Sequence, residues 1–331
     1  MENLMFSLNA TVPVFLVMVI GYLLKNFKIM DESFVKTLNK FNYNITLPLL
    51  LFQDIAGSDF ASVWDTSYVL FCFLCTLFCI TSTWIITAKV YHKKDLIGEF
   101  VQASYRSSAA VLGIAFIQNI YGNAGMAPLM IIGTVPLYNV AAVIILSFTT
   151  PSAGEASIAG TGTTGSSSDS LYRRIAVRKS VKGIFTNPII IGILAGMLVS
   201  ALGISFPVIV SKTINYFAVL ATPLALIGLG AGFEGKKALA MLKPTLICSF
   251  IKLGLWPILF LPLAVFLGFT AEKLVAILIM LASPTTVSCY IMAKNMKHKG
   301  ILTSSVVVTT TLLSSVTLTF WLYLLKSIGL I

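Results

Sequence analysis

The sequence predicts an all-α polytopic membrane protein with ten transmembrane helices, and three observations predict this fold class. Of the 331 residues, 57% are hydrophobic and 11% are charged, whereas about a quarter of the residues in a soluble domain are charged. The hydrophobic residues form ten apolar stretches that can cross a bilayer as helices. Lysine and arginine alternate between the connecting segments, as they do when loops alternate between the two sides of a membrane. We therefore expect a lipid bilayer around the protein, and no nucleic-acid partner for the net charge of +11.

Each span is placed on its apolar stretch, at about 20 residues per crossing. The first five spans are expected at residues 11–25, 41–56, 67–88, 100–121 and 127–149, and the second five at 184–203, 213–232, 245–268, 274–293 and 302–325. Between the two sets, residues 155–170 are rich in Gly, Ser and Thr and are expected to form a flexible linker. The chain thus divides into a first five-helix unit at 1–150, a linker region at 151–182 and a second unit at 183–331.

Basic residues fix the expected orientation, because cytoplasmic loops are enriched in Lys and Arg. The loops after spans one, three, five, seven and nine hold nearly all of them: Lys25, Lys28, Lys36 and Lys40; Lys89, Lys93 and Lys94; Arg173, Arg174, Arg178, Lys179 and Lys182; Lys236, Lys237 and Lys243; Lys294, Lys297 and Lys299. The opposite side has only Lys212, Lys273 and Lys326. We expect a multi-pass protein of the cell membrane with both termini outside and the linker in the cytoplasm.

The ninth span is interrupted by the stretch LASPTTVSCY, from Leu281 to Tyr290. Pro284 cannot donate a backbone hydrogen bond, so carbonyl groups near Leu281 should lose their helical partners. In a bilayer such backbone survives only against protein or a water-filled cavity. Ser283 followed by Pro284 is typical of an N-cap and first helical position, which predicts that the helix restarts there. The alternative is a simple proline kink inside a packed helix.

Internal similarity indicates that the two units are inverted repeats, because units of five spans insert in opposite orientations. Pro13 and Gly21 in span one match Pro188 and Gly196 in span six at an offset of 175 residues. Pro48 and Pro223, in spans two and seven, share this offset, and so do the small residues Ser108 and Ser283. Inverted repeats with discontinuous helices at the membrane midplane are typical of secondary transporters.

Several motifs, in order along the ten spans, resemble those of the auxin efflux carrier family, which includes the plant PIN-formed carriers and bacterial malate or malonate permeases. The motifs are Asn39 with Pro48 and Phe52, YRSSAAVLGIAF in span four, PLYN at Pro136 to Asn139, NPIIIGILAG from Asn187, ATPLALIGLGAGF in span seven and ASPTTVSCYIMA from Ala282. The resemblance implies that spans four and nine are broken and cross near the midplane, that two repeats form a scaffold and a transport domain, and that the protein is a homodimer. Ser108 and Ala115 depart from the Asn and Pro that are usual in the family, which leaves the exact crossover open.

The charges within the spans indicate an anionic substrate. None of the twelve carboxylates falls at the predicted centre of a span, and Asp54 and Glu99 lie nearest, close to span ends. Arg106 and Lys252 instead lie about two turns into spans four and eight from the cytoplasm. Their alternative interpretation is snorkelling, in which the side chain reaches back to the inner interface. Helix N-termini at the two breaks would add partial positive charge and free N–H donors, which suit a carboxylate.

These observations define the candidate site. The substrate-binding residues are expected to be Arg106, Ser107, Ser108, Gly113, Lys252, Ser283, Pro284, Thr285, Thr286 and Ser288, with Asn39, Pro48, Asn139 and Pro223 in supporting positions. All five cysteines lie in apolar segments, and Cys72, Cys75 and Cys79 share one helical face without a His or carboxylate, which favours helix packing over metal binding. No cofactor, metal or enzymatic activity is expected, because no Ser, His and Asp set accompanies the spans.

The main hypothesis is a secondary transporter that moves an organic anion, most simply a carboxylate, by alternating access. Without a carboxylate at the midplane to bind protons or sodium, electrogenic export driven by the membrane potential is the favoured mode. The alternative is a membrane receptor or sensor that binds a small ligand on the same fold without transport. The sequence lacks a soluble signalling domain, which favours the transporter.

Overall fold

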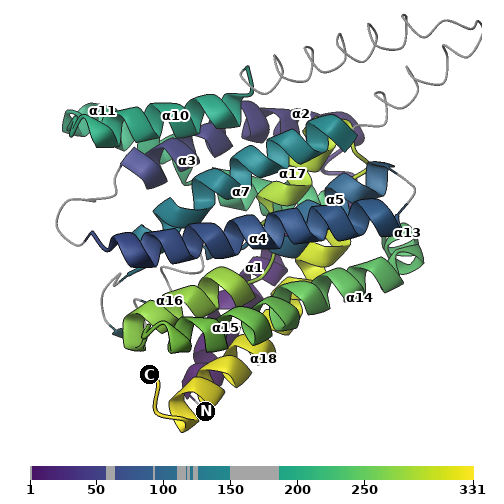
Figure 1. Cartoon of the computed structure of the whole chain (residues 1–331). Coiled ribbons are helices and arrows are strands. Elements are labelled where there is room, and N and C mark those ends of the chain that lie inside the picture. Colours follow the sequence, from purple (N-terminus) through teal and green to yellow (C-terminus); the bar gives the residue numbers. More distant parts are fainter. Residues whose placement is uncertain are drawn as a thin grey trace, which may run out of the picture.

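The computed structural model describes residues 2–56, 64–91, 94–109, 117, 120–121, 126–149 and 186–331, with the side chains of these residues from residue 12 onward except those of Lys94 and Asp95. The regular elements of these residues are all helices (Figure 1). The predicted linker at 155–170 and its basic residues lie outside the described residues, as does Gly113.

The described helices follow the order of the predicted spans. In the first unit they are α1 (Glu2–Asn26), α2 (Glu32–Phe41), the π-helical turn η1 (Asn42–Thr46), α3 (Leu47–Ala56), α4 (Thr66–Val90), α5 (Lys94–Tyr105) and α7 (Ala127–Thr149). In the second unit they are α10 (Pro188–Ala201), α11 (Val208–Ala218), α12 (Ala221–Ala231), α13 (Gly235–Ala240), α14 (Leu242–Phe250), the π-helical turn η3 (Ile251–Leu255), α15 (Trp256–Phe266), α16 (Ala271–Ala282), α17 (Ser288–Asn295) and α18 (Ile301–Ser327). Lys36 and Lys40, expected in a loop, belong to α2 instead.

Five described helical segments are long and apolar enough to cross a membrane. They are Thr66–Val90, Ala127–Thr149, Val208–Ala231, Leu242–Phe266 and Ile301–Ser327, which correspond to predicted spans three, five, seven, eight and ten. The largest shift of a boundary is at span seven, expected from residue 213 and observed from Val208. The shorter apolar helices Val12–Asn26 and Pro188–Ala201 fall on spans one and six. The prediction of an all-helical membrane protein is confirmed at this level, while the full set of ten crossings stays a prediction.

Two helix contacts follow the 175-residue offset between the units. α1 packs along α12, and α3 packs along α10. Gly21 of α1 lies so close to the backbone of Ile227 that a Cβ atom would clash with it. Gly196 is the position of Gly21 plus 175, and Phe52 is the position of Ile227 minus 175. A Cβ on Gly196 of α10 would lie 2.9 Å from the carbonyl oxygen of Phe52 in α3. Small residues thus let both helix pairs approach closely, as they do in membrane proteins generally.

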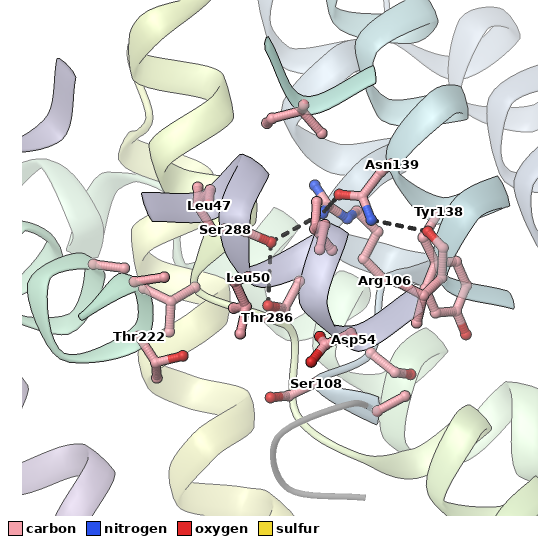
Figure 2. Close-up of a pocket in the computed structure, with 18 residues that line it drawn as sticks. Leu47, Leu50, Asp54, Arg106, Ser108, Tyr138, Asn139, Thr222, Thr286 and Ser288 are labelled. Atoms are coloured by element: carbon pink, nitrogen blue, oxygen red, sulfur yellow. Dashed lines mark hydrogen bonds between the residues drawn. The ribbon is translucent and has the colours of Figure 1, made fainter. Parts of the chain in front are cut away.

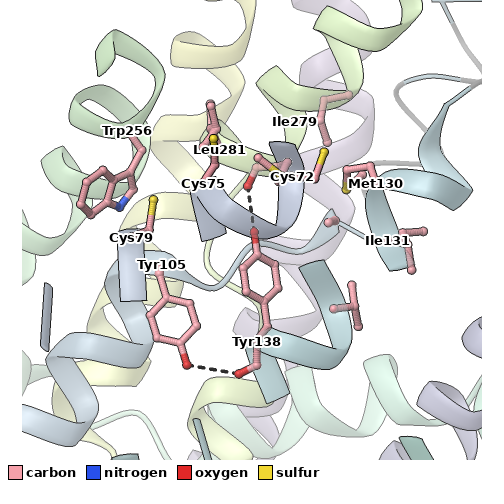
Figure 3. Packing of buried hydrophobic residues seen from close by; sticks show 14 of the residues in the cluster. Cys72, Cys75, Cys79, Tyr105, Met130, Ile131, Tyr138, Trp256, Ile279 and Leu281 are labelled. Carbon is pink, nitrogen blue, oxygen red and sulfur yellow. Dashed lines mark hydrogen bonds between the residues drawn. The ribbon is translucent and has the colours of Figure 1, made fainter. Parts of the chain in front are cut away.

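The interior beneath these pairs is formed by α4, α7 and α16. Cys72, Cys75 and Cys79 lie on one buried face of α4, and all three thiols are free (Figure 3). They belong to the same hydrophobic cluster as Tyr105 and Tyr138, whose ring centroids lie 5.8 Å apart with the ring planes tilted by 40°. The predicted role of the cysteines in helix packing agrees with this environment.

Candidate functional site

One helix is interrupted and a second helix ends beside the interruption, and the backbone segments at these two places pair with each other. α16 ends at Ala282 and α17 begins at Ser288, while α5 ends at Tyr105. Between them Ser107 and Thr285 form an antiparallel β-bridge, and the Ser108 N–H donates to the Pro284 carbonyl at 2.9 Å. Five residues separate α16 from α17, so the interpretation as a simple kink is wrong and the helix is broken at Ser283 and Pro284. The predicted restart at these two residues is also wrong, because Ser283 is the C-cap of α16 and α17 begins only at Ser288. Span four also leaves the helix, at Arg106.

The break leaves two carbonyl groups of α16 without their helical donors. Pro284 has no N–H for the Met280 carbonyl, and the N–H of Thr285 donates to Thr310 Oγ1 at 3.1 Å rather than to Leu281. Side chains replace both donors: the Ser107 hydroxyl donates to the Met280 carbonyl, and Lys252 Nζ donates to the Leu281 carbonyl at 2.5 Å. The loss of helical partners near Leu281, expected from the sequence, is therefore met by polar groups from spans four and eight.

A pocket with a cavity volume of about 70 Å³ lies beside the paired breaks, several times the space that one water molecule requires (Figure 2). Its polar lining residues are Asp54, Arg106, Ser107, Ser108, Tyr138, Asn139, Thr222, Thr286 and Ser288. Its apolar lining residues are Leu47, Leu50, Leu51, Ala109, Val135, Ile189, Ala221, Ala225 and Val287. The lining comes from α3, α7, α10, α12 and both breaks, so the pocket joins the two units of the chain.

Arg106 is the buried cation of this pocket, with 2% of its surface exposed. Its Nη2 donates to Asn139 Oδ1 at 2.7 Å and to Ser288 Oγ at 2.9 Å, as Figure 2 shows. Its Nη1 lies 2.8 Å from Met292 Sδ, and its Nε has no hydrogen-bond partner among the described residues. The guanidinium group is held by α7 and α17 inside the protein, so the snorkelling interpretation of Arg106 is wrong.

Lys252 is also fully buried, but it lies behind the pocket rather than in its lining. It belongs to η3, the π-helical turn between α14 and α15, a type of irregularity that is frequent at functional sites. Besides the Leu281 carbonyl, its ammonium group donates to Ser107 Oγ and approaches the Met280 carbonyl at 3.5 Å. Snorkelling is therefore wrong for Lys252 as well.

The other predicted site residues divide into two groups. Ser107, Ser108, Thr286 and Ser288 line the pocket together with Arg106. The pocket lining does not include Ser283, Pro284 or Thr285, and the Thr285 hydroxyl donates to the Ala103 carbonyl at 2.8 Å. For this second group the geometry supports a role in holding the breaks together.

The predicted supporting residues are more dispersed. Asn139 lines the pocket and binds Arg106 directly, so it is closer to the ligand site than expected. Asn39 is buried on α2, where its carbonyl accepts from Asn295 of α17 at 3.2 Å. The carbonyl of Pro48 lies against Gly192, and Pro223 lies in α12 outside the pocket lining.

Asp54 is the lining residue that sequence reasoning missed. We expected no carboxylate near the site because Asp54 lies close to the end of span two, and the structure corrects this expectation by placing it in the pocket lining (Figure 2). A signal was available: Leu47, Leu50, Leu51 and Asp54 recur at the spacing of one helical face. The same face of α3 lines the pocket.

A bundle of apolar helices with a polar pocket at two paired helix breaks is the architecture of a membrane transporter. The model of the family described as membrane transport protein matches residues 6–322, nearly the whole chain, so this protein belongs to that family. The resemblance to the auxin efflux carriers is thereby confirmed. No curated protein matches the chain in a sequence search.

Proposed function

We propose that this membrane transporter is a secondary transporter that moves an organic carboxylate anion by alternating access, with the pocket beside the paired breaks as the substrate site. The observation that carries the proposal is the buried guanidinium group of Arg106 in the pocket lining. Among the described residues its hydrogen bonds go to neutral groups, and none of the ion pairs found there includes it. A buried cation without a paired anion is unfavourable, and a carboxylate ligand would supply the missing charge.

Besides the positive charge of Arg106, the pocket offers a carboxylate hydrogen-bond donors and apolar surface. Nε of Arg106 has no partner among the described residues, and the hydroxyls of Ser108, Thr286 and Ser288 can donate to ligand oxygens. The apolar lining from α3, α10 and α12 suits the hydrocarbon part of an organic acid. The positive charge of Arg106, the hydroxyl donors and the apolar lining from α3, α10 and α12 together favour an organic anion over an inorganic one.

The proposed architecture is two inverted five-helix repeats, at residues 1–150 and 183–331, joined by a cytoplasmic linker at 151–182. The matched approach of Gly21 to Ile227 and of Gly196 to Phe52, at the same 175-residue offset, supports this symmetry. The substrate site lies between the repeats, where alternating access by rocking of one repeat against the other would expose it to each side in turn. The family resemblance adds the expectation of a homodimer.

The proposed orientation has both termini outside and the linker in the cytoplasm, from the alternation of basic residues. Single-cysteine labelling of intact cells tests it with an impermeant reagent. A cysteine introduced at Ile331 should react and one introduced at Ser167 should not. The reverse pattern would contradict the orientation.

The functional test is flux of radiolabelled acetate, benzoate, malonate and malate in proteoliposomes that contain the purified protein. Arg106→Gln should strongly reduce flux, at low substrate concentration, of any carboxylate that the parent protein moves, whereas Lys212→Gln, which removes an exposed cation on α11, should leave it intact. Saturable binding of a carboxylate without any flux would instead identify a receptor on this fold. Equal flux in Arg106→Gln and the parent protein would contradict the proposed site.

A further inference from the structure

The ammonium group of Lys252 is surrounded by three oxygen atoms that belong to the two paired breaks. It donates to Ser107 Oγ and to the Leu281 carbonyl at 2.5 Å, and the Met280 carbonyl lies 3.5 Å away. Lys252 is 0% exposed, and no ion pair found among the described residues includes it. Three N–H groups thus face three oxygens, which accounts for every donor of the ammonium group.

These oxygens form a site for a cation rather than a site for a neutral donor. Both carbonyls belong to the last turn of α16, where the helix dipole places partial negative charge. They are free only because Pro284 ends the helical hydrogen bonding there. In transporters with discontinuous helices, the carbonyls of unwound backbone and half-helix C-termini are the groups that coordinate a co-transported cation. Here the end of a lysine side chain occupies such a position.

We propose that the Lys252 ammonium group is a tethered cation that takes the place of a free monovalent cation at the paired breaks. A transporter with a mobile cation at this position must bind that ion before the two breaks can hold the substrate site together. In this protein the amino group that carries the charge is covalently attached to the chain. The consequence for transport, which rests on the proposed function, is that the anion binds without a sodium ion beside it.

The tethered cation is connected to the pocket through Ser107. Ser107 receives the Lys252 N–H, donates to the Met280 carbonyl and also lines the pocket. Its neighbour in sequence, Arg106, is the pocket cation. Loss of the ammonium group should therefore loosen Ser107 and open a polar space that small cations can reach from the pocket.

The test is cation rescue of the Lys252→Ala variant of the full chain, measured as the midpoint of thermal unfolding in detergent. The substitution removes the equivalent of n-propylammonium, so n-propylammonium chloride is the closest probe, followed by sodium and lithium chloride. Choline chloride at equal ionic strength is the reference, because choline has no N–H donor and is larger. Lys243→Ala, which removes an exposed cation from α14 of the same helical segment, is the matched control.

The expected result is a lower midpoint for Lys252→Ala in choline chloride, with a recovery of about 2–4 °C at saturating n-propylammonium or sodium. For Lys243→Ala and for the parent protein, the midpoint of thermal unfolding should not depend on which of the four salts is present. A Lys252→Ala midpoint that is unchanged, or lowered and insensitive to every cation, would overturn the proposal. If that variant does not fold, the midpoint of thermal unfolding of the parent protein still tests the proposal. A midpoint raised specifically by sodium would show that a free cation binds despite Lys252 and would overturn the proposal.

This test uses no organic anion, so it separates the tethered cation from the proposed function. Cation rescue of Lys252→Ala in a protein that moves none of the carboxylates would support the inference and contradict the function. Carboxylate flux in the parent protein that increases when external choline is replaced by sodium would leave the function intact and overturn the inference.

Discussion

Arg106 and Lys252 are two buried cations of the same membrane protein, yet the structure surrounds them differently. Arg106 faces the pocket and is held by side chains, Asn139 of α7 and Ser288 of α17, which can rearrange around a ligand. Lys252 faces main-chain carbonyls at the end of α16, which stay where the backbone holds them. Burying a charge within a membrane span is energetically costly at any position, so the function of each cation must be inferred from the groups that surround it. We infer that Arg106 binds the substrate and that Lys252 stabilises the interrupted backbone at the end of α16.

The largest expected effect is on anion binding when Arg106 is replaced. Arg106→Gln removes a charged donor and should weaken carboxylate binding by about 1.5–3 kcal/mol, roughly 10- to 100-fold in Kd. Arg106→Lys should recover part of this loss, since it keeps the charge but loses the planar pair of donors. Equilibrium binding of a radiolabelled carboxylate to the purified variants measures both values. An unchanged Kd in Arg106→Gln would show that Arg106 does not bind the substrate, and would contradict the different roles assigned to Arg106 and Lys252.

A smaller effect, of opposite sign, is expected at Asp54, the carboxylate in the same pocket lining as Arg106. Two like charges that share one pocket repel by on the order of 1–2 kcal/mol at an effective dielectric constant of about 20. Asp54→Asn should therefore strengthen carboxylate binding by roughly tenfold under conditions in which the Asp54 carboxyl is ionised. Glu32→Gln, which removes an exposed carboxylate on α2, is the matched control and should have no effect. Weaker binding in Asp54→Asn would mean that this carboxylate assists the substrate.

The role assigned to Lys252 predicts a coupling with Pro284. Lys252→Met leaves the α16 carbonyls without their charged donor and should destabilise the protein by about 1–3 kcal/mol. Pro284→Ala restores an N–H that can reach the Met280 carbonyl, so the same lysine substitution should cost less in that background, by about 0.5–1.5 kcal/mol. Thermal unfolding of the parent protein, the two single variants and the double variant measures this coupling. Strictly additive losses would contradict the shared role of the two residues.

The smallest effect concerns an ordinary ion pair at the ends of the spans, which provides a reference for both buried cations. Lys273 Nζ lies 2.5 Å from Asp65 Oδ2 and, with the Ser67 hydroxyl and the Tyr68 N–H, holds the pKa of the Asp65 carboxyl well below its usual range. Because the pKa is lower in the folded protein, the ionised carboxyl stabilises the fold above about pH 4 and loses this effect as the pH falls. Asp65→Asn keeps an N-cap side chain on α4, so the substitution removes mainly the charge.

The expected loss of stability for Asp65→Asn is at most about 1 kcal/mol at pH 7, since the pair is partly exposed to solvent. The difference from the parent protein should begin to shrink in thermal unfolding as the pH falls below about 4, and it should continue to shrink toward the lowered pKa of the folded protein. A difference that persists unchanged at pH 3 would show that packing, and not charge, is responsible.

The sequence was sufficient for the features that depend on local chemistry. Apolar length predicted the long helices of spans three, five, seven, eight and ten, and Pro284 predicted the break in span nine. The depth of Arg106 and Lys252 marked them as functional candidates. Their surroundings could not be predicted, because Asn139 and Leu281 meet these cations only through tertiary packing. Asp54 was missed for a similar reason: its place near a span end was read as distance from the site, although α3 directs that face into the pocket.

The most direct test of the account is carboxylate flux in proteoliposomes whose membrane potential is set with potassium and valinomycin, without a sodium or proton gradient. Moving one elementary charge through 100 mV is worth about 2.3 kcal/mol, so an uncoupled monovalent anion should accumulate about 50-fold on the positive side. The account predicts flux that follows the imposed potential in size and direction, in sodium and in choline alike. Flux that ignores the potential, or that requires a sodium or proton gradient, would contradict it.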